Sequence, residues 1–95
     1  MSKFREHLNN KLKNSAFKDE FERQRQLSDL ALKIQQERNK KGLSQTDLAQ
    51  LAGITQQQLS KIENAVNSNI LTYLKVLNAL DYSLAVKPQK KLVNA

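Results

Sequence analysis

The sequence contains no cysteine and no tryptophan, and only two glycines and one proline among its 95 residues. The absence of cysteine excludes disulfides and thiolate metal sites. So little glycine and proline is typical of a helical protein rather than of a sheet or a linker. No apolar run approaches the roughly 18 residues that a membrane span needs, and no signal-peptide core follows Met1. We therefore expect an all-α cytoplasmic protein with no membrane contact.

Residues that carry chemistry are also sparse. His7 is the only histidine, and it has no neighbouring cysteine or obvious carboxylate partner, so neither a metal site nor a nucleophile–base pair is indicated. The chain has no glycine-rich phosphate loop, and its 39% apolar content suffices for one small core but leaves little room for a catalytic cleft. We expect no enzyme activity, no metal and no cofactor.

Positive charge is in clear excess, since 16 Lys and Arg against 9 Asp and Glu give a net charge of +7. Such an excess favours a polyanionic partner, usually nucleic acid. A basic surface that merely keeps the protein in solution explains the same numbers. A motif must therefore decide between the two interpretations.

Residues 1–26 read as an N-terminal helical arm. Their apolar side chains recur at nearly regular helical spacing: Phe4, Leu8, Leu12, Phe17 and Phe21. Asn14 and Ser15 interrupt this repeat, which predicts two short helices or one kinked helix. The stripe is thin and surrounded by charge, so we expect the arm to bind a partner surface. The alternative is that it packs back on its own domain or frays.

Residues 27–80 read as a domain of four or five helices. The first helix carries an inward stripe and ends before Gly42: Leu27, Leu30, Ala31 and Ile34. Ser44 caps a second helix with Asp47 at the reciprocal position, and this helix ends at Gly53. Its expected apolar face consists of Leu48, Leu51 and Ala52.

The third and fourth helices follow the same logic. Thr55 caps the third helix with Gln58 placed to close the box, and Leu59 and Ile62 point inward. Ser68 or Asn69 caps the fourth helix. Its expected inward residues are Ile70, Leu71, Leu74, Leu77 and Leu80.

Residues 81–95 change period. Tyr82, Leu84 and Val86 alternate with other residues up to Pro88, which predicts one short β-strand followed by a mobile tail. A lone strand lacks a ladder partner, so we expect it to pair with the same strand of a second copy and form a homodimer. Pairing against the N-terminal arm is the alternative.

The segment GLSQTDLAQLAGITQQQLSKIEN, residues 42–64, resembles the helix-turn-helix of phage repressors, the XRE or Cro-C1 type. The resemblance implies a structural ion pair between Arg38 and Glu63. It also implies that the third helix enters the major groove, where Gln56 and Gln57 read bases. The DNA-binding residues expected on this basis are Gln45, Thr55, Gln56, Gln57, Gln58, Ser60, Lys61 and Asn64.

Two positions depart from the family pattern. Ala65 stands where most relatives have glycine after the third helix, so we expect Asn64 or Asn67 to supply any left-handed residue. Asn69 stands where a proline commonly precedes the fourth helix. Both changes make the contacts of this loop with phosphate harder to assign.

The whole-chain layout resembles HigA-type antitoxins of toxin–antitoxin systems. This resemblance implies two functions: the dimer binds an inverted-repeat operator in double-stranded DNA and represses its own operon, and the arm neutralises a protein toxin of the RelE/HigB-like ribonuclease class. The expected toxin-binding anchors are Phe4, Leu8, Phe17 and Phe21. The alternatives are a free-standing XRE-family regulator and a HipB-type antitoxin with a kinase-like toxin.

Overall fold

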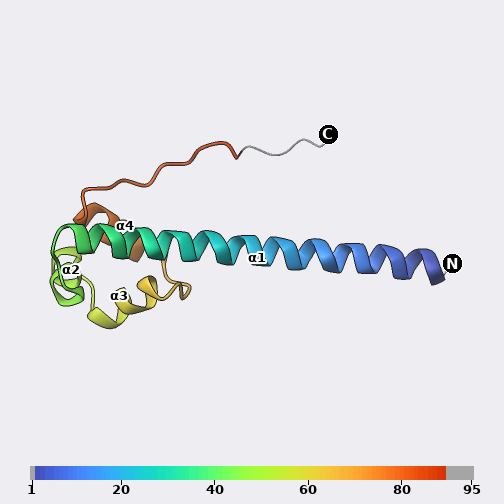
Figure 1. Ribbon diagram of the computed structural model, residues 1–95, viewed down its shortest axis with the longest axis horizontal. Helices are drawn as coiled ribbons and strands as arrows, with labels where there is room; N and C mark the ends of the chain where they lie inside the picture. The colour runs from blue at the N-terminus through green and yellow to red at the C-terminus, as the bar shows by residue number, and fades with distance from the viewer. Residues whose placement is uncertain (1, 90–95) are drawn as a thin grey trace.

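The computed structural model describes the backbone of residues 2–89 and the side chains of residues 14–89. Within these residues the chain forms four helices, α1 (Ser2–Lys40), α2 (Gln45–Ala52), α3 (Gln56–Glu63) and α4 (Ile70–Ala79). The three short helices gather at the C-terminal end of α1, and the N-terminal part of α1 projects away from them (Figure 1). The molecule is therefore elongated, with extents of 60 × 28 × 20 Å.

The arm and the first helix of the domain form one continuous helix, so the prediction of two short helices or a kink was wrong. Residues 1–41 contain neither glycine nor proline, and Asn14 and Ser15 each disfavour a helix by less than about 0.7 kcal/mol. That cost is too small to interrupt a helix that is favourable on both sides. Ion pairs three or four residues apart also span its middle: Glu20–Arg23 at 3.0 Å, Glu22–Arg25 at 2.8 Å and Arg25–Asp29 at 3.0 Å.

One apolar core holds the four helices together. Its most buried side chains have at most 1% of their surface exposed and come from all four helices and the residue after α4: Ile34, Leu48, Leu59, Ile62, Val76 and Leu80. Burial of each such side chain contributes about 1.5–3 kcal/mol. Leu27 and Leu30 pack against this core from α1, as their spacing predicted.

The inward face was predicted incorrectly at three positions. Leu51 of α2 is 63% exposed, and Ile70 and Leu71 of α4 are 61% and 55% exposed. The buried face consists of Tyr73, Val76 and Leu77 with Leu80 just after the helix, spaced i, i+3, i+4 and i+7, so Leu77 and Leu80 are buried as predicted whereas Tyr73 and Val76 were not predicted. Because α4 is apolar on most of its surface, its sequence offers two stripes, and only packing selects between them.

All four helices end in the same way. A residue one or two positions beyond the last residue of each helix adopts a left-handed backbone with positive φ: Gly42 (69°), Gly53 (70°), Ala65 (58°) and Asp81 (66°). In each case the next amide donates to the carbonyl five residues earlier, for example Val66 N to Lys61 O at 2.9 Å. This is the Schellman motif. The expectation that Asn64 or Asn67 takes the left-handed position was wrong, because Ala65 takes it.

The segment after α4 extends back alongside α1 and reaches the C-terminal part of the arm (Figure 1). No strand is present among residues 2–89, so Tyr82, Leu84 and Val86 lie in extended chain without a ladder partner. They are 39%, 49% and 98% exposed. The first of them is anchored, since its amide donates to Leu77 O at 2.8 Å and the Lys33 ammonium lies 5.7 Å from its ring centroid. A single chain cannot complete a strand here, and the homodimer stays a prediction.

Candidate nucleic-acid interface

A tight turn of three residues, Gly53 to Thr55, joins α2 to α3. Gly53 provides the left-handed backbone that reverses the chain, and the amide of Ile54 donates to Ala49 O at 3.0 Å. Ala49 and Ala52 are buried between the helices, where their small side chains permit a close crossing. This geometry is the helix-turn-helix that the sequence predicted.

Reciprocal hydrogen bonds cap both helices of the motif. Ser44 Oγ accepts from the amide of Asp47 at 3.0 Å, and the Asp47 carboxylate accepts from the amide of Ser44 at 3.0 Å. Thr55 and Gln58 form the same box at the start of α3, at 3.1 Å and 2.9 Å. Hydrogen bonds from the backbone and side chain of Ser44 hold the pKa of Asp47 below its usual range. Both predicted capping boxes are therefore confirmed.

Arg38 and Glu63 lie together as a buried ion pair. Arg38 Nε and Nη2 donate to the two oxygens of Glu63 at 2.7 and 2.9 Å, and its remaining nitrogen Nη1 donates to Leu43 O at 2.9 Å. The side chains of the pair are only 14% and 3% exposed. Hydrogen bonding to Glu63 raises the pKa of Arg38. The pair fixes the end of α3 against α1 in one bidentate geometry.

Two amide side chains complete the polar network around Glu63. Gln45 Nε2 donates to Glu63 Oε1 at 3.1 Å, and Gln35 Nε2 donates to the Glu63 carbonyl at 2.6 Å. Gln45, which the sequence assigned to phosphate binding, is therefore occupied in part by an internal contact. Gln35 plays no part in the sequence-based prediction, because an exposed-looking glutamine in α1 gives no signal for a contact with a residue 28 positions later.

The two faces of α3 differ sharply. Leu59 and Ile62 are fully buried, whereas the side chains that face solvent are polar or basic: Gln56, Gln57, Gln58 and Lys61. Ser60 is half-buried, and the exposed Asn64 donates its amide to Ser60 O at 2.8 Å. Of the residues expected to contact DNA, all but the half-buried Gln45 of α2 thus lie at the start, along the outer side or at the end of α3.

Thr46 is a residue of this surface that the sequence reasoning missed. It is the second residue of α2, and its hydroxyl donates to Gln56 Oε1 at 3.2 Å. Both side chains are exposed. A threonine on the outer face of a short helix belongs to no sequence motif. Its contact with Gln56 depends on how α2 and α3 cross, so it could not be predicted from the sequence.

Basic side chains near the motif are partly paired. Lys40 lies 3.3 Å from the Glu37 carboxylate and Lys41 lies 3.4 Å from the Asp81 carboxylate. Hydrogen bonds from Tyr82, then from Lys40 and Lys33, hold the pKa of Glu37 below its usual range. The positive charge at this end of α1 is therefore partly neutralised within the chain.

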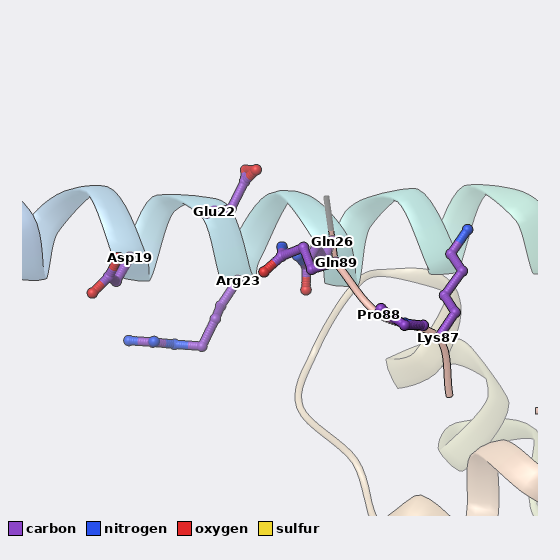
Figure 2. Close-up of a pocket in the computed structure, with 7 residues that line it drawn as sticks. All are labelled: Asp19, Glu22, Arg23, Gln26, Lys87, Pro88 and Gln89. Carbon is purple, nitrogen blue, oxygen red and sulfur yellow. The ribbon is translucent and has the colours of Figure 1, made fainter. Parts of the chain in front are cut away.

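An open groove of about 580 Å³ lies between α1 and the C-terminal segment (Figure 2). All the residues that line it are exposed except Glu22, which is half-buried: Asp19, Glu22, Arg23, Gln26, Lys87, Pro88 and Gln89. Glu22 is paired with Arg25, whose hydrogen bond lowers the pKa of Glu22. Such walls are solvated and enclose no reactive group.

The described part of the chain also lacks two other kinds of feature. None of its helices combines the length and the apolarity that crossing a membrane requires. Among the same residues, no group of three or more histidine or acidic side chains has the arrangement of a metal site.

Comparison with known proteins identifies the family of the chain. No curated protein matches the chain. The HTH_3 family, described as helix-turn-helix, matches residues 34–87, which is more than half of the chain and contains both helices of the motif. Together with the capped α2–turn–α3 unit, this match shows that the chain belongs to the HTH_3 family of DNA-binding helix-turn-helix proteins.

Proposed function

We propose that this protein is a transcriptional repressor that recognises a specific DNA operator by placing α3 in the major groove. The observation that carries the proposal is the division of α3 into a fully buried apolar face and an exposed face that begins with Gln56 and Gln57. A helix fits the major groove, which is about 12 Å wide. A glutamine amide pairs with adenine by donating to N7 and accepting from N6.

The internal hydrogen bonds sort the remaining candidates by role. The Gln58 side-chain oxygen already accepts a hydrogen bond from the amide of Thr55, so we assign Gln58 to capping α3 and not to base reading. The Thr55 hydroxyl accepts from the amide of Gln58 but retains its proton, which suits a phosphate oxygen. We assign base reading to Gln56 and Gln57, groove or flanking-phosphate contacts to Ser60 and Lys61, and backbone contacts to Thr55, Gln45 and Asn64.

Binding to a pool of DNA duplexes with a randomised centre tests these roles. Gln56→Ala and Gln57→Ala should each reduce discrimination at one base pair by about 1–3 kcal/mol. Lys61→Ala should weaken all sequences alike and reduce the salt dependence of binding. Gln36→Ala, an exposed glutamine of α1, is the matched control and should change nothing. Unaltered base preference in both α3 glutamine variants would refute the proposed recognition helix.

The proposal includes a homodimer on an inverted repeat. A two-fold dimer places two recognition helices about 34 Å apart, which is one turn of DNA. Support comes from the extended and exposed Leu84 and Val86, whose backbone lacks a ladder partner within residues 2–89. Light scattering should give about 22 kDa, twice the 10.9 kDa of one chain. Val86→Pro should shift the mass toward one chain, because proline removes an amide from the ladder, and a monomeric wild type would contradict the strand pairing.

A second candidate function, the HigA-type antitoxin, is favoured by the arm. Phe17 and Phe21 are 72% and 64% exposed on α1, so they do not pack back on the domain. Phe4 and Leu8, the other expected anchors, have side chains outside the described residues. Two large aromatic side chains on a projecting helix suit a protein partner that covers them, and a toxin is the partner we propose.

Co-expression of the tagged protein with its neighbouring open reading frames tests the antitoxin role. A small partner that co-purifies in fixed ratio and is lost in Phe17→Ser/Phe21→Ser, but kept in the control Ala16→Ser/Gln24→Ser, would support it. The partner's mass and sequence would separate a ribonuclease toxin from the kinase-like toxin of a HipB-type pair. A bare homodimer that binds DNA would instead leave the protein a free-standing regulator.

A further inference from the structure

We infer that Thr46 is a positioning residue for recognition of one base pair, acting through Gln56; this inference rests on the proposed base-reading role of Gln56. The carrying observation is the hydrogen bond from the Thr46 hydroxyl to Gln56 Oε1, at 3.2 Å across the α2–α3 crossing. Neighbouring residues on α2 thus tie both ends of α3, since Gln45 reaches Glu63 at its last residue and Thr46 reaches Gln56 at its first.

The anchor itself is rigid. Thr46 lies within the capping box of Ser44 and Asp47, which fixes the first turn of α2. Its hydroxyl lies one bond beyond Cβ, so the donor has few rotamers to occupy. Gln56 is the opposite case, because three side-chain torsions separate its amide from the backbone and the side chain is exposed. The hydrogen bond from the short Thr46 side chain therefore restricts the conformations of the longer Gln56 side chain.

The chemistry of the amide makes this order useful for reading adenine. With Oε1 held by Thr46, both hydrogens of Nε2 stay free to donate to adenine N7, and the second lone pair of Oε1 stays free to accept from N6. Ordering a free side chain on binding normally weakens an interface, and an amide that is already ordered avoids that loss. Loss of the Thr46 hydroxyl should thus reduce discrimination at the Gln56 base pair by about 2- to 10-fold.

The alternative role for an exposed hydroxyl at the start of α2 is a direct phosphate contact. The two roles differ in what they change. A phosphate contact weakens all DNA sequences alike, whereas positioning of Gln56 changes the preference at one base pair only. A phosphate contact also persists when Gln56 is absent, but positioning through Gln56 cannot.

The experiment measures binding of the full-length protein to the pool of DNA duplexes with a randomised centre, followed by sequencing of the bound fraction. The variants are Thr46→Val, which keeps the shape and removes the hydroxyl, Thr46→Ser, which keeps the hydroxyl, Gln56→Ala, and the double variant Thr46→Val/Gln56→Ala. We expect Thr46→Val to flatten the preference at the base pair that Gln56→Ala also affects, Thr46→Ser to restore it, and the double variant to equal Gln56→Ala. Circular dichroism confirms that each variant is folded.

Other outcomes overturn the inference in distinguishable ways. Uniform weakening across all sequences in Thr46→Val, with Gln56→Ala still changing one base pair, would make Thr46 a phosphate contact and leave the proposed function intact. Unchanged binding in Thr46→Val would show that the hydroxyl does nothing for Gln56. If Gln56→Ala itself leaves the base preference unchanged, then the base-reading role falls and the inference about Thr46 falls with it.

Discussion

Ala65 occupies a backbone conformation that suits glycine, and its replacement by glycine should stabilise the protein. Its φ of 58° lies in the left-handed region, which costs an L-residue roughly 1–2 kcal/mol because Cβ approaches the following carbonyl oxygen. Glycine removes that cost but loses about 0.5–1 kcal/mol through the greater freedom of the unfolded chain. The difference predicts that Ala65→Gly raises the free energy of unfolding by about 1 kcal/mol.

The chain offers a reciprocal control at the end of α2. Gly53 has a φ of 70° in the same motif, and a Cβ built on it meets no atom within 4 Å. Gly53→Ala therefore introduces only the backbone cost, without a clash, and should lower the free energy of unfolding by about 1 kcal/mol. Asn64→Gly, one residue before Ala65 at a φ of −101°, should give no gain.

Urea unfolding followed by far-ultraviolet circular dichroism is the suitable assay, because the protein is helical and has no tryptophan to report by fluorescence. A change of about 1 kcal/mol corresponds to roughly 4–8 °C in Tm for a domain of this size. All variants are compared at one protein concentration, since dimer formation would make stability depend on it. Ala65→Gly would contradict the reasoning if it destabilised the protein as an alanine-to-glycine change inside a helix does.

Three further perturbations test the core and the ion pair by urea unfolding, and the caps by thermal unfolding at different pH values, all followed by circular dichroism. Leu59→Ala should cost about 2–5 kcal/mol because the side chain is fully buried, while Leu51→Ala at 63% exposure should cost less than about 0.5 kcal/mol; equal costs would contradict the assigned core. Arg38→Met should cost about 3–5 kcal/mol by leaving Glu63 buried without its partner, and Arg38→Met/Glu63→Leu should recover most of that loss; no recovery would show that the pair itself stabilises. The pKa of Asp47 lies below 3.8 in the folded state, so its contribution is complete above about pH 5 and is lost as the pH falls through that lowered pKa; Tm should therefore depend less on acidification in Asp47→Asn, and an unchanged dependence would contradict the capping assignment.

Local signals carried most of the prediction of the fold. Both capping boxes, the left-handed Gly53 and the stripe from Leu27 to Ile34 depend on contacts within a few residues, so the sequence states them directly. The face of α4 was predicted only in part, because Leu77 is buried as expected but the exposed Ile70 and Leu71 are as apolar as the buried Val76. Which side of such a helix is buried depends on the neighbouring helices, which no local pattern encodes.

The candidate interface divides along the same line. The residue types at the start of α3 and their resemblance to a repressor motif sufficed to predict an exposed row of glutamines. The hydrogen bonds of that row could not be predicted, since the partner of Gln56 is Thr46 on another helix and the partner of Gln45 is Glu63 at the far end of α3. Contacts of this kind depend on how two helices cross, which a local sequence pattern does not predict.

The position of Ala65 shows how tertiary contacts select a backbone conformation against local preference. Ile62 is fully buried and Glu63 is held by Arg38, so α3 cannot end before Glu63 without losing both interactions. With the end of the helix fixed there, the Schellman motif requires its left-handed residue two positions later, which is Ala65. Asparagine tolerates that conformation better, but Asn64 lies one position too early and Asn67 two positions too late. A cost of roughly 1–2 kcal/mol at Ala65 is smaller than the about 3–5 kcal/mol expected from breaking the ion pair, so the helix end stays where the core and the pair put it.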